Sequence, residues 1–241
     1  MRHIKLLGTA LLMVLSLSAI MTAAASAVEE PTKILAEPTE TEPLTFTSVS
    51  GEGRLLTLGK KEVKCKKDKG SGEFTLPNLG TYKVLFENCT GESGSTCTGV
   101  SQETGTIKQE GTVHYVLALL SGKLIAALVG LPKEFHFTCE ALGGFVKILV
   151  VVLGCIAALA EPVEKLTKTT KDVFQFNAAN SGDPDISEIL MEEATSEIPC
   201  VLLSSINGGK FESSGLEGTA TNEGFKKGGK AVEVLLMNKK M

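Results

Sequence analysis

Short apolar runs alternate with glycine-bearing polar turns along most of the chain beyond residue 44, a pattern typical of β-strands. The clearest strand covers residues 80–87, where Tyr82, Val84 and Phe86 share one face and polar side chains take most of the other. Such alternation predicts a sheet with one face toward solvent. The pattern as a whole predicts an all-β fold, either an antiparallel barrel or a two-layer sandwich, stapled by disulfides and with at most one short helix.

Two central segments, 123–131 and 145–153, carry apolar residues on both faces. Strands of that kind are normally covered on both sides. They therefore fit central strands between layers, strands that face a ligand cavity, or membrane segments. A membrane helix needs about 20 consecutive apolar residues, and the apolar stretches within 115–160 are either interrupted, as at 121–123, or too short. The enrichment in Val and Ile favours buried strands.

The turn residues predict how these segments connect. Residues 112–120 and 123–131, joined by Ser121-Gly122, predict a tight hairpin. The lysine- and glycine-rich residues 66–72 predict a polar turn between two strands. In an acidic stretch near the end of the chain, Ser187 predicts the cap of a short helix that contains residues 189–191.

The N-terminus has the features of an export signal. A basic start and an apolar stretch from Leu6 to Met21 lead to Ala25-Ser26-Ala27, which matches an A-x-A cleavage site. We therefore expect a signal peptide over residues 1–27, with a retained membrane anchor as the alternative. Residues 28–43 are acidic and rich in Pro and Thr, which predicts a flexible leader. Residues 44–241 then form a single β-rich domain of a secreted or cell-envelope protein of bacterial type.

Composition narrows the range of partners. The chain has 241 residues and a net charge of −4, and removal of the signal, with Arg2 and Lys5 and no acid, changes that charge to −6. An acidic protein gains nothing from phosphate backbones, so nucleic acid is not an expected partner. Trp is absent and Arg54 is the one arginine of the mature chain. This argues against stacking platforms for sugars or bases and against bidentate anion recognition.

All six cysteines lie in the mature part, and an even number in an exported chain predicts disulfides. Their spacing does not fit a zinc site, because no Cys-x-x-Cys occurs. We expect no metal and no cofactor. Six cysteines allow fifteen pairings, and the residues alone do not choose among them. The disulfide candidates are Cys65, Cys89, Cys97, Cys139, Cys155 and Cys200.

Six short blocks of the sequence are distinctive: VKCKKDKGSGEF (63–74), VLFENC (84–89), CT (97–98), FHFTC (135–139), EPVEK (161–165) and SSINGGKFESSGL (204–216). These blocks resemble a family of uncharacterised exported proteins from actinobacteria. The resemblance covers most of residues 60–225. The family has no established activity, so the resemblance implies a secreted β-rich protein and no particular chemistry.

The same resemblance suggests a pairing of the cysteines. Four of them match cysteines of the family, whereas Cys155 and Cys200 fall where the family usually has none. This implies that Cys155 pairs with Cys200 as an added bridge. For the remaining four we expect Cys89–Cys97, across a short polar loop, and Cys65–Cys139.

Few residues could carry catalysis, and we assign no catalytic residue. His136 lies on a polar, solvent-facing row, and His114 shares a row with apolar residues. A hydrolase that uses His114 as its base would also need a nucleophile at a strained turn, and no G-x-S-x-G motif is present. The acidic residues Asp183 and Asp185 lack the ligand spacing of a calcium loop.

These observations favour a secreted or cell-envelope structural or binding module without catalytic activity. The first alternative is a carrier that encloses a small lipophilic ligand between its doubly apolar strands. The second is a membrane-associated protein that uses residues 115–160, and the third is the hydrolase based on His114. The expected partner is thus a cell-envelope component or a small lipophilic ligand.

Overall fold

The computed structural model describes residues 41–57, 61–76, 78–120, 123–161, 167–169, 173–176, 186–190 and 200–236. The predicted signal peptide and most of the predicted leader lie outside these residues. The described elements are β-strands and two short 3-10 turns, η1 (Glu92–Gly94) and η2 (Leu142–Gly144). The all-β prediction, with at most one short helix, is confirmed for the described residues.

The strands follow one another in short succession. They are β1 (Leu44–Ser50), β2 (Gly53–Thr57), β3 (Glu62–Phe74), β4 (Leu79–Thr90), β5 (Thr96–Gly99), β6 (Thr106–Leu120), β7 (Lys123–Pro132), β8 (Phe135–Ala141), β9 (Val146–Gly154), β10 (Ile156–Glu161), β11 (Thr167–Thr169), β12 (Val173–Phe176), β13 (Ile186–Leu190), β14 (Leu202–Ile206), β15 (Glu212–Lys227), β16 (Lys230–Val232) and β17 (Val234–Leu236).

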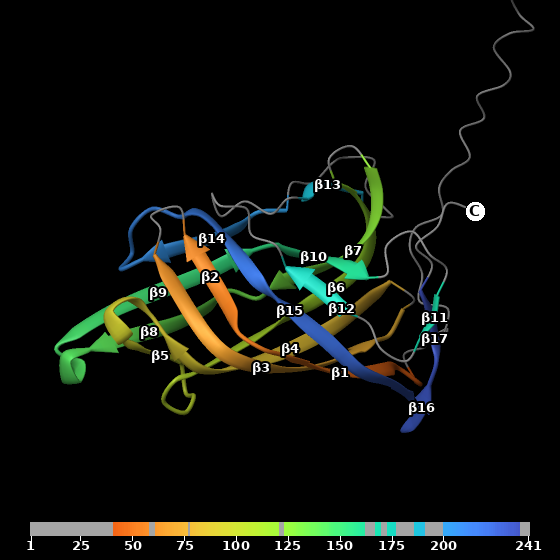
Figure 1. Cartoon of the computed structure of the whole chain (residues 1–241), viewed down its shortest axis with the longest axis horizontal. Helices are drawn as coiled ribbons and strands as arrows, with labels where there is room; N and C mark the ends of the chain where they lie inside the picture. The colour runs from red at the N-terminus through yellow and green to blue at the C-terminus, as the bar shows by residue number, and fades with distance from the viewer. Residues whose placement is uncertain are drawn as a thin grey trace, which may run out of the picture. The chain divides into compact units, whose positions relative to one another are not determined.

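Fifteen of these strands belong to one antiparallel sheet, and β11 pairs with β17 separately. Several strands that follow one another in sequence lie end to end, and we call each such strand pair, or a strand that stands alone, a line of the sheet. β1 and β2 both pair with β3 on one side and with β15 on the other, so they form a single line between those two strands (Figure 1). In the same way β7 and β8 run as one line against β10 and β9.

The sheet closes on itself. Its lines follow in chain order as β1/β2, β3, β4, β5/β6, β7/β8, β9/β10 and β12/β14, each antiparallel to the next. The last line, β15, then pairs with β1, Leu44 opposite Lys227, and completes the circuit. The opposite walls of the closed sheet face one another across the interior, as the prediction of an antiparallel barrel or sandwich requires.

The predicted hairpin over residues 112–131 is confirmed, since β6 and β7 pair from Gly111 opposite Pro132 to Leu120 opposite Lys123. The predicted turn over residues 66–72 is wrong, because β3 runs through it without interruption. The predicted helix near Ser187 is also wrong. Residues 187–190 belong to β13, which pairs with the part of β6 that lies beyond the end of β4.

Glycine within β3 explains why a turn-like sequence forms a strand. Gly72 lies between Phe46 on β1 and Tyr82 on β4 in the strand register. A Cβ at Gly72 would overlap both the Phe46 ring and the carbonyl oxygen of Thr81. The missing side chain lets the Phe46 ring lie directly over the backbone of β3, an arrangement that supports strong sheet curvature. Gly72, which looks like a turn residue in the sequence, is therefore required for close packing between the strands.

The interior holds two clusters of buried apolar residues. The first is aromatic, with Phe74 and Tyr115 rings 5.5 Å apart and Tyr115 and Phe174 rings 6.2 Å apart. The second surrounds four cysteines. The first cluster is Leu44, Phe74, Val113, Tyr115, Ala158, Phe174 and Phe225, and the second is Cys65, Cys89, Cys97, Ile107, Phe137, Cys139, Val150, Val152 and Leu202.

The two doubly apolar segments are strands, but they are not neighbours. β7 lies between β6 and β10, whereas β9 lies between β8 and β14. The expectation that both faces are covered is wrong for the start of β9. Phe145 is 92% exposed, and Val146 and Leu149 are also exposed, because the hairpin of β8 and β9 extends beyond the last pair of β14, Ile206 opposite Val150. Among the described residues, no helix is long and apolar enough to span a membrane.

Candidate functional site

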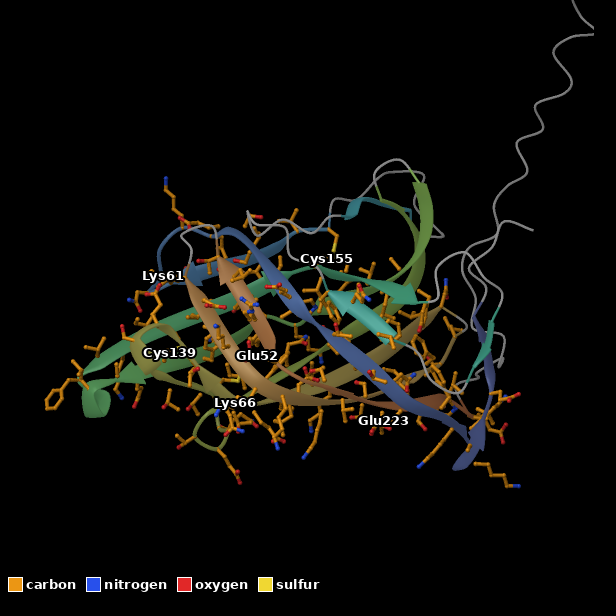
Figure 2. The ribbon with its side chains drawn as sticks, viewed as in Figure 1. Glu52, Lys61, Lys66, Cys139, Cys155 and Glu223 are labelled. Carbon is orange, nitrogen blue, oxygen red and sulfur yellow. A yellow bond between two sulfur atoms is a disulfide. The ribbon has the colours of Figure 1, made fainter. Side chains whose placement is uncertain are left out.

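Three disulfides join all six cysteines, as Cys65–Cys89, Cys97–Cys139 and Cys155–Cys200. Figure 2 labels Cys139 on β8 and Cys155 at the junction of β9 and β10. Disulfides form and persist in oxidising compartments, so the bridges indicate that the chain folds in such an environment.

The expected Cys155–Cys200 bridge is present, but the expected Cys89–Cys97 and Cys65–Cys139 bridges are wrong. The strand register gives the reason. Cys65 lies directly opposite Cys89 in the β3–β4 pair, and Cys97 lies directly opposite Cys139 in the β5–β8 pair. Strand pairing, and not the shortness of the intervening loop, selects the partners.

The structure places His136 and His114 on two different strands, β8 and β6. His136 is exposed, and its Nε2 lies 2.8 Å from a carboxylate oxygen of Glu134, as expected for a solvent-facing row. His114 is partly buried, and desolvation lowers its pKa. It lies on the face of β6 opposite to Val113 and Tyr115, which point into the core. Asp183 and Asp185 lie outside the described residues.

Two adjoining cavities lie inside the closed sheet. The large inner cavity has a volume of about 100 Å³ and the small inner cavity about 60 Å³. An apolar cavity of about 150 Å³ is known to hold a benzene molecule. The two cavities together therefore offer room for a ligand of about that size, with a thin partition between them. The residues that line both, and so form the partition, are Gly53, Phe86, Gln109, Ile156 and Leu216.

The large inner cavity has two chemically different walls. Four consecutive lines of the sheet contribute an apolar wall, which consists of Val113 on β6, Leu128 on β7, Ile156 on β10, and Phe174 and Phe176 on β12. The facing residues of β1 and β3 form a polar wall, which consists of Ser48, Ser50, Asp68 and Gly70. Apolar surface with a few placed polar groups is typical of small-molecule sites.

Asp68 is the ionisable group of the polar wall. Ser50 lies opposite Asp68 in the β1–β3 register, and the Ser50 hydroxyl donates a hydrogen bond to Oδ2 of Asp68. Burial raises the pKa of the Asp68 carboxyl above its ordinary value, and the hydrogen bond from Ser50 partly opposes that shift. Oδ1, the second oxygen, has no hydrogen-bond partner among the described residues.

A second polar pair stands at the side of the cavity. Gln109 is 4% exposed, and its Nε2 donates a hydrogen bond to Oη of Tyr82 at 2.6 Å and another to the carbonyl oxygen of Glu110 at 3.0 Å. Burial raises the pKa of Tyr82 far above its ordinary value, so the phenol stays neutral. Both side chains of this pair are thus fixed in position at the edge of the partition.

The lining of the large inner cavity also includes charged and exposed residues. Lys83 and Thr219 line the cavity, and both residues are exposed. Glu217 also lines it and forms an ion pair with Arg54, whose Nε lies 3.6 Å from Oε2 of Glu217.

We expect Asp68 to make stability decrease as the pH rises. Because the folded carboxyl has a raised pKa, the folded protein binds its proton more tightly than the unfolded chain does. The resulting stabilisation is complete below the ordinary pKa of 3.8 and is lost as the pH rises through the folded pKa. Asp68→Asn removes the ionisable group and should abolish this decline.

Urea unfolding of the wild type and Asp68→Asn, from about pH 3.5 to about pH 7, measures the effect. The lysine-paired Glu87 and Glu110 have lowered pKa values and give the opposite slope, but they are common to both proteins. A wild-type minus variant difference that stays constant with pH would contradict the raised pKa.

The sequence alone did not identify this site. Alternation placed Tyr82, Val84 and Phe86 on one face, and all three do line the large inner cavity. Asp68 is surrounded by lysines and glycines in sequence, which suggested a solvated turn. The polar wall arises only when β1 and β3 pair, and the available signal was the serines that follow Phe46 at alternate positions.

The described residues contain no group of three or more His, Cys, Asp or Glu side chains placed to hold a metal ion. Comparison of the chain with protein-family models, with curated proteins and with solved structures found no match.

Proposed function

We propose that this chain is an exported, non-catalytic carrier that holds a small lipophilic molecule inside its closed sheet. The observation that carries the proposal is the pair of adjoining cavities, of about 100 and 60 Å³, with an apolar wall contributed by four consecutive lines of the sheet. The three disulfides are consistent with export to an oxidising compartment, in agreement with the predicted signal peptide.

The size of the cavities limits the ligand. Typical ligand pockets measure about 300–1,000 Å³, so a long lipid chain does not fit without rearrangement of the aromatic core. One ring or a short branched chain matches the volume of the two cavities together, and to occupy both it would have to displace the partition residues Phe86 and Ile156.

Toluene is a suitable probe, because its ring matches the apolar wall and it carries no polar group. We expect saturating toluene to raise the unfolding temperature of the protein, since a ligand that binds only the folded state stabilises it by mass action. The variant Val84→Phe adds bulk inside the large inner cavity and should lose the shift. Val100→Phe, the same substitution at a residue that is 70% exposed, should keep it. Absence of a shift in the wild type, or an equal shift in both variants, would contradict the proposal.

The second candidate is a structural module of the cell envelope with no ligand. It is favoured by the two clusters of buried side chains in the interior and by the small volume of the cavities. Extraction of the purified protein with organic solvent, followed by mass spectrometry, separates the two candidates. A stoichiometric small molecule supports the carrier, and a clean extract together with no response to toluene supports the structural module.

A further inference from the structure

The polar wall of the large inner cavity gives the proposed carrier a chemical preference. Asp68 is the acidic side chain that the cavity partly removes from water. Of the other charged side chains of the lining, Lys83 is exposed and Glu217 is engaged with Arg54. The strongest electrostatic interaction with a bound molecule therefore comes from the Asp68 carboxylate, because solvent screens exposed charges more effectively than buried ones.

The geometry of the carboxyl leaves one acceptor for a ligand. The Ser50 hydroxyl occupies Oδ2, which fixes the orientation of the group. Oδ1 has no partner among the described residues and belongs to a side chain of the cavity lining. A ligand that donates a hydrogen bond to Oδ1 would relieve the cost of desolvating the carboxylate, and a cationic donor would also neutralise its charge.

We propose that the large inner cavity, extended by the small inner cavity beyond the partition, selects a small primary amine with one apolar ring or a short apolar chain. Its ammonium group donates to Oδ1 of Asp68, and its apolar part packs against the wall formed by β6, β7, β10 and β12. The net negative charge of the chain favours the approach of such a cation. This inference rests on the proposed carrier function and adds the chemical class of the ligand.

Three probes of one size test the preference: benzylamine, benzyl alcohol and benzoate, with toluene as the apolar reference. We expect benzylamine to bind the wild type about tenfold or more tightly than benzyl alcohol, as measured by calorimetry, because hydrogen bonds between charged groups exceed neutral ones by this order. Benzoate should bind more weakly than either. Asp68→Asn should remove the benzylamine advantage.

Glu223→Gln is the matched control. It removes one negative charge from the outer face of β15, where Glu223 is exposed (Figure 2), and should change no affinity by more than about twofold.

Equal binding of benzylamine and benzyl alcohol to the wild type would overturn the amine preference, as would an equal loss of benzylamine affinity in Asp68→Asn and Glu223→Gln. If toluene also fails to bind the wild type, the carrier function itself is wrong. If toluene binds without an amine preference, only the present inference is wrong. The comparison of probes on the wild type holds even if Asp68→Asn does not fold.

Discussion

Replacement of Phe74 by alanine is expected to lower the free energy of unfolding by about 3–5 kcal/mol, one of the two largest effects of any change that we predict. Phe74 is 2% exposed and lies between two other rings, with centroids 5.4 Å from Phe46 and 5.5 Å from Tyr115. Gly80, on the paired strand β4, lies close against the Phe74 ring, since a Cβ there would be 2.9 Å from it. Truncation leaves a void that these neighbours cannot fill without movement of the backbone.

Phe145→Ala is the matched control, since it removes the same side chain from a position that is 92% exposed. We expect it to change the free energy of unfolding by less than about 0.5 kcal/mol. Urea unfolding followed by far-ultraviolet circular dichroism measures both variants. Similar effects for the two substitutions would mean that the aromatic cluster does not form the core.

The second large effect is expected from Cys97→Ala/Cys139→Ala, which removes a bridge between β5 and β8. Loss of the constraint on a loop of 42 residues costs about 4 kcal/mol in the chain-entropy treatment. Both cysteines are buried in the second cluster, so their truncation also removes packing. We expect a loss of about 4–5 kcal/mol in urea unfolding.

Cys155→Ala/Cys200→Ala provides the comparison, because its bridge spans a similar 45 residues and Cys155 is less buried. The difference between the two double variants therefore reports the packing of Cys97 and Cys139. A loss of less than about 1 kcal/mol in Cys97→Ala/Cys139→Ala would contradict the prediction. A peptide map under non-reducing conditions that joins Cys89 to Cys97 would contradict the pairing itself.

Local patterns in the sequence predicted much of the fold. The alternation of Tyr82, Val84 and Phe86 identified the inward face of β4, and the dipeptide at residues 121–122 marked the hairpin of β6 and β7. These features depend on neighbours in the chain, so periodicity and turn chemistry are sufficient to find them.

The features that the sequence did not predict depend on residues far apart in the chain. Gly72 resembles a turn residue until Phe46 is placed over it, and the partners of Cys65 and Cys97 follow from the register of strands that no local pattern specifies. Asp68 appears solvated until Ser50 on β1 pairs with it. The candidate site therefore depends on the register between strands that are far apart in the chain, and local patterns in a single sequence do not predict that register.

The pairing of Leu44 with Lys227 brings the first and last strands of the closed sheet side by side. Because the closed sheet has no first or last strand in space, the chain could in principle begin at any of its strands. A circularly permuted chain, with residues 41 and 236 joined by a linker and new ends in residues 101–104 between β5 and β6, where Ser101, Glu103 and Thr104 are exposed, would keep every strand pair of the sheet. Only the order in which the strands are synthesised would change. A comparison of the folding of such permutants with that of the natural chain would therefore show how much folding depends on the order of translation and how much on the strand pairs of the closed sheet.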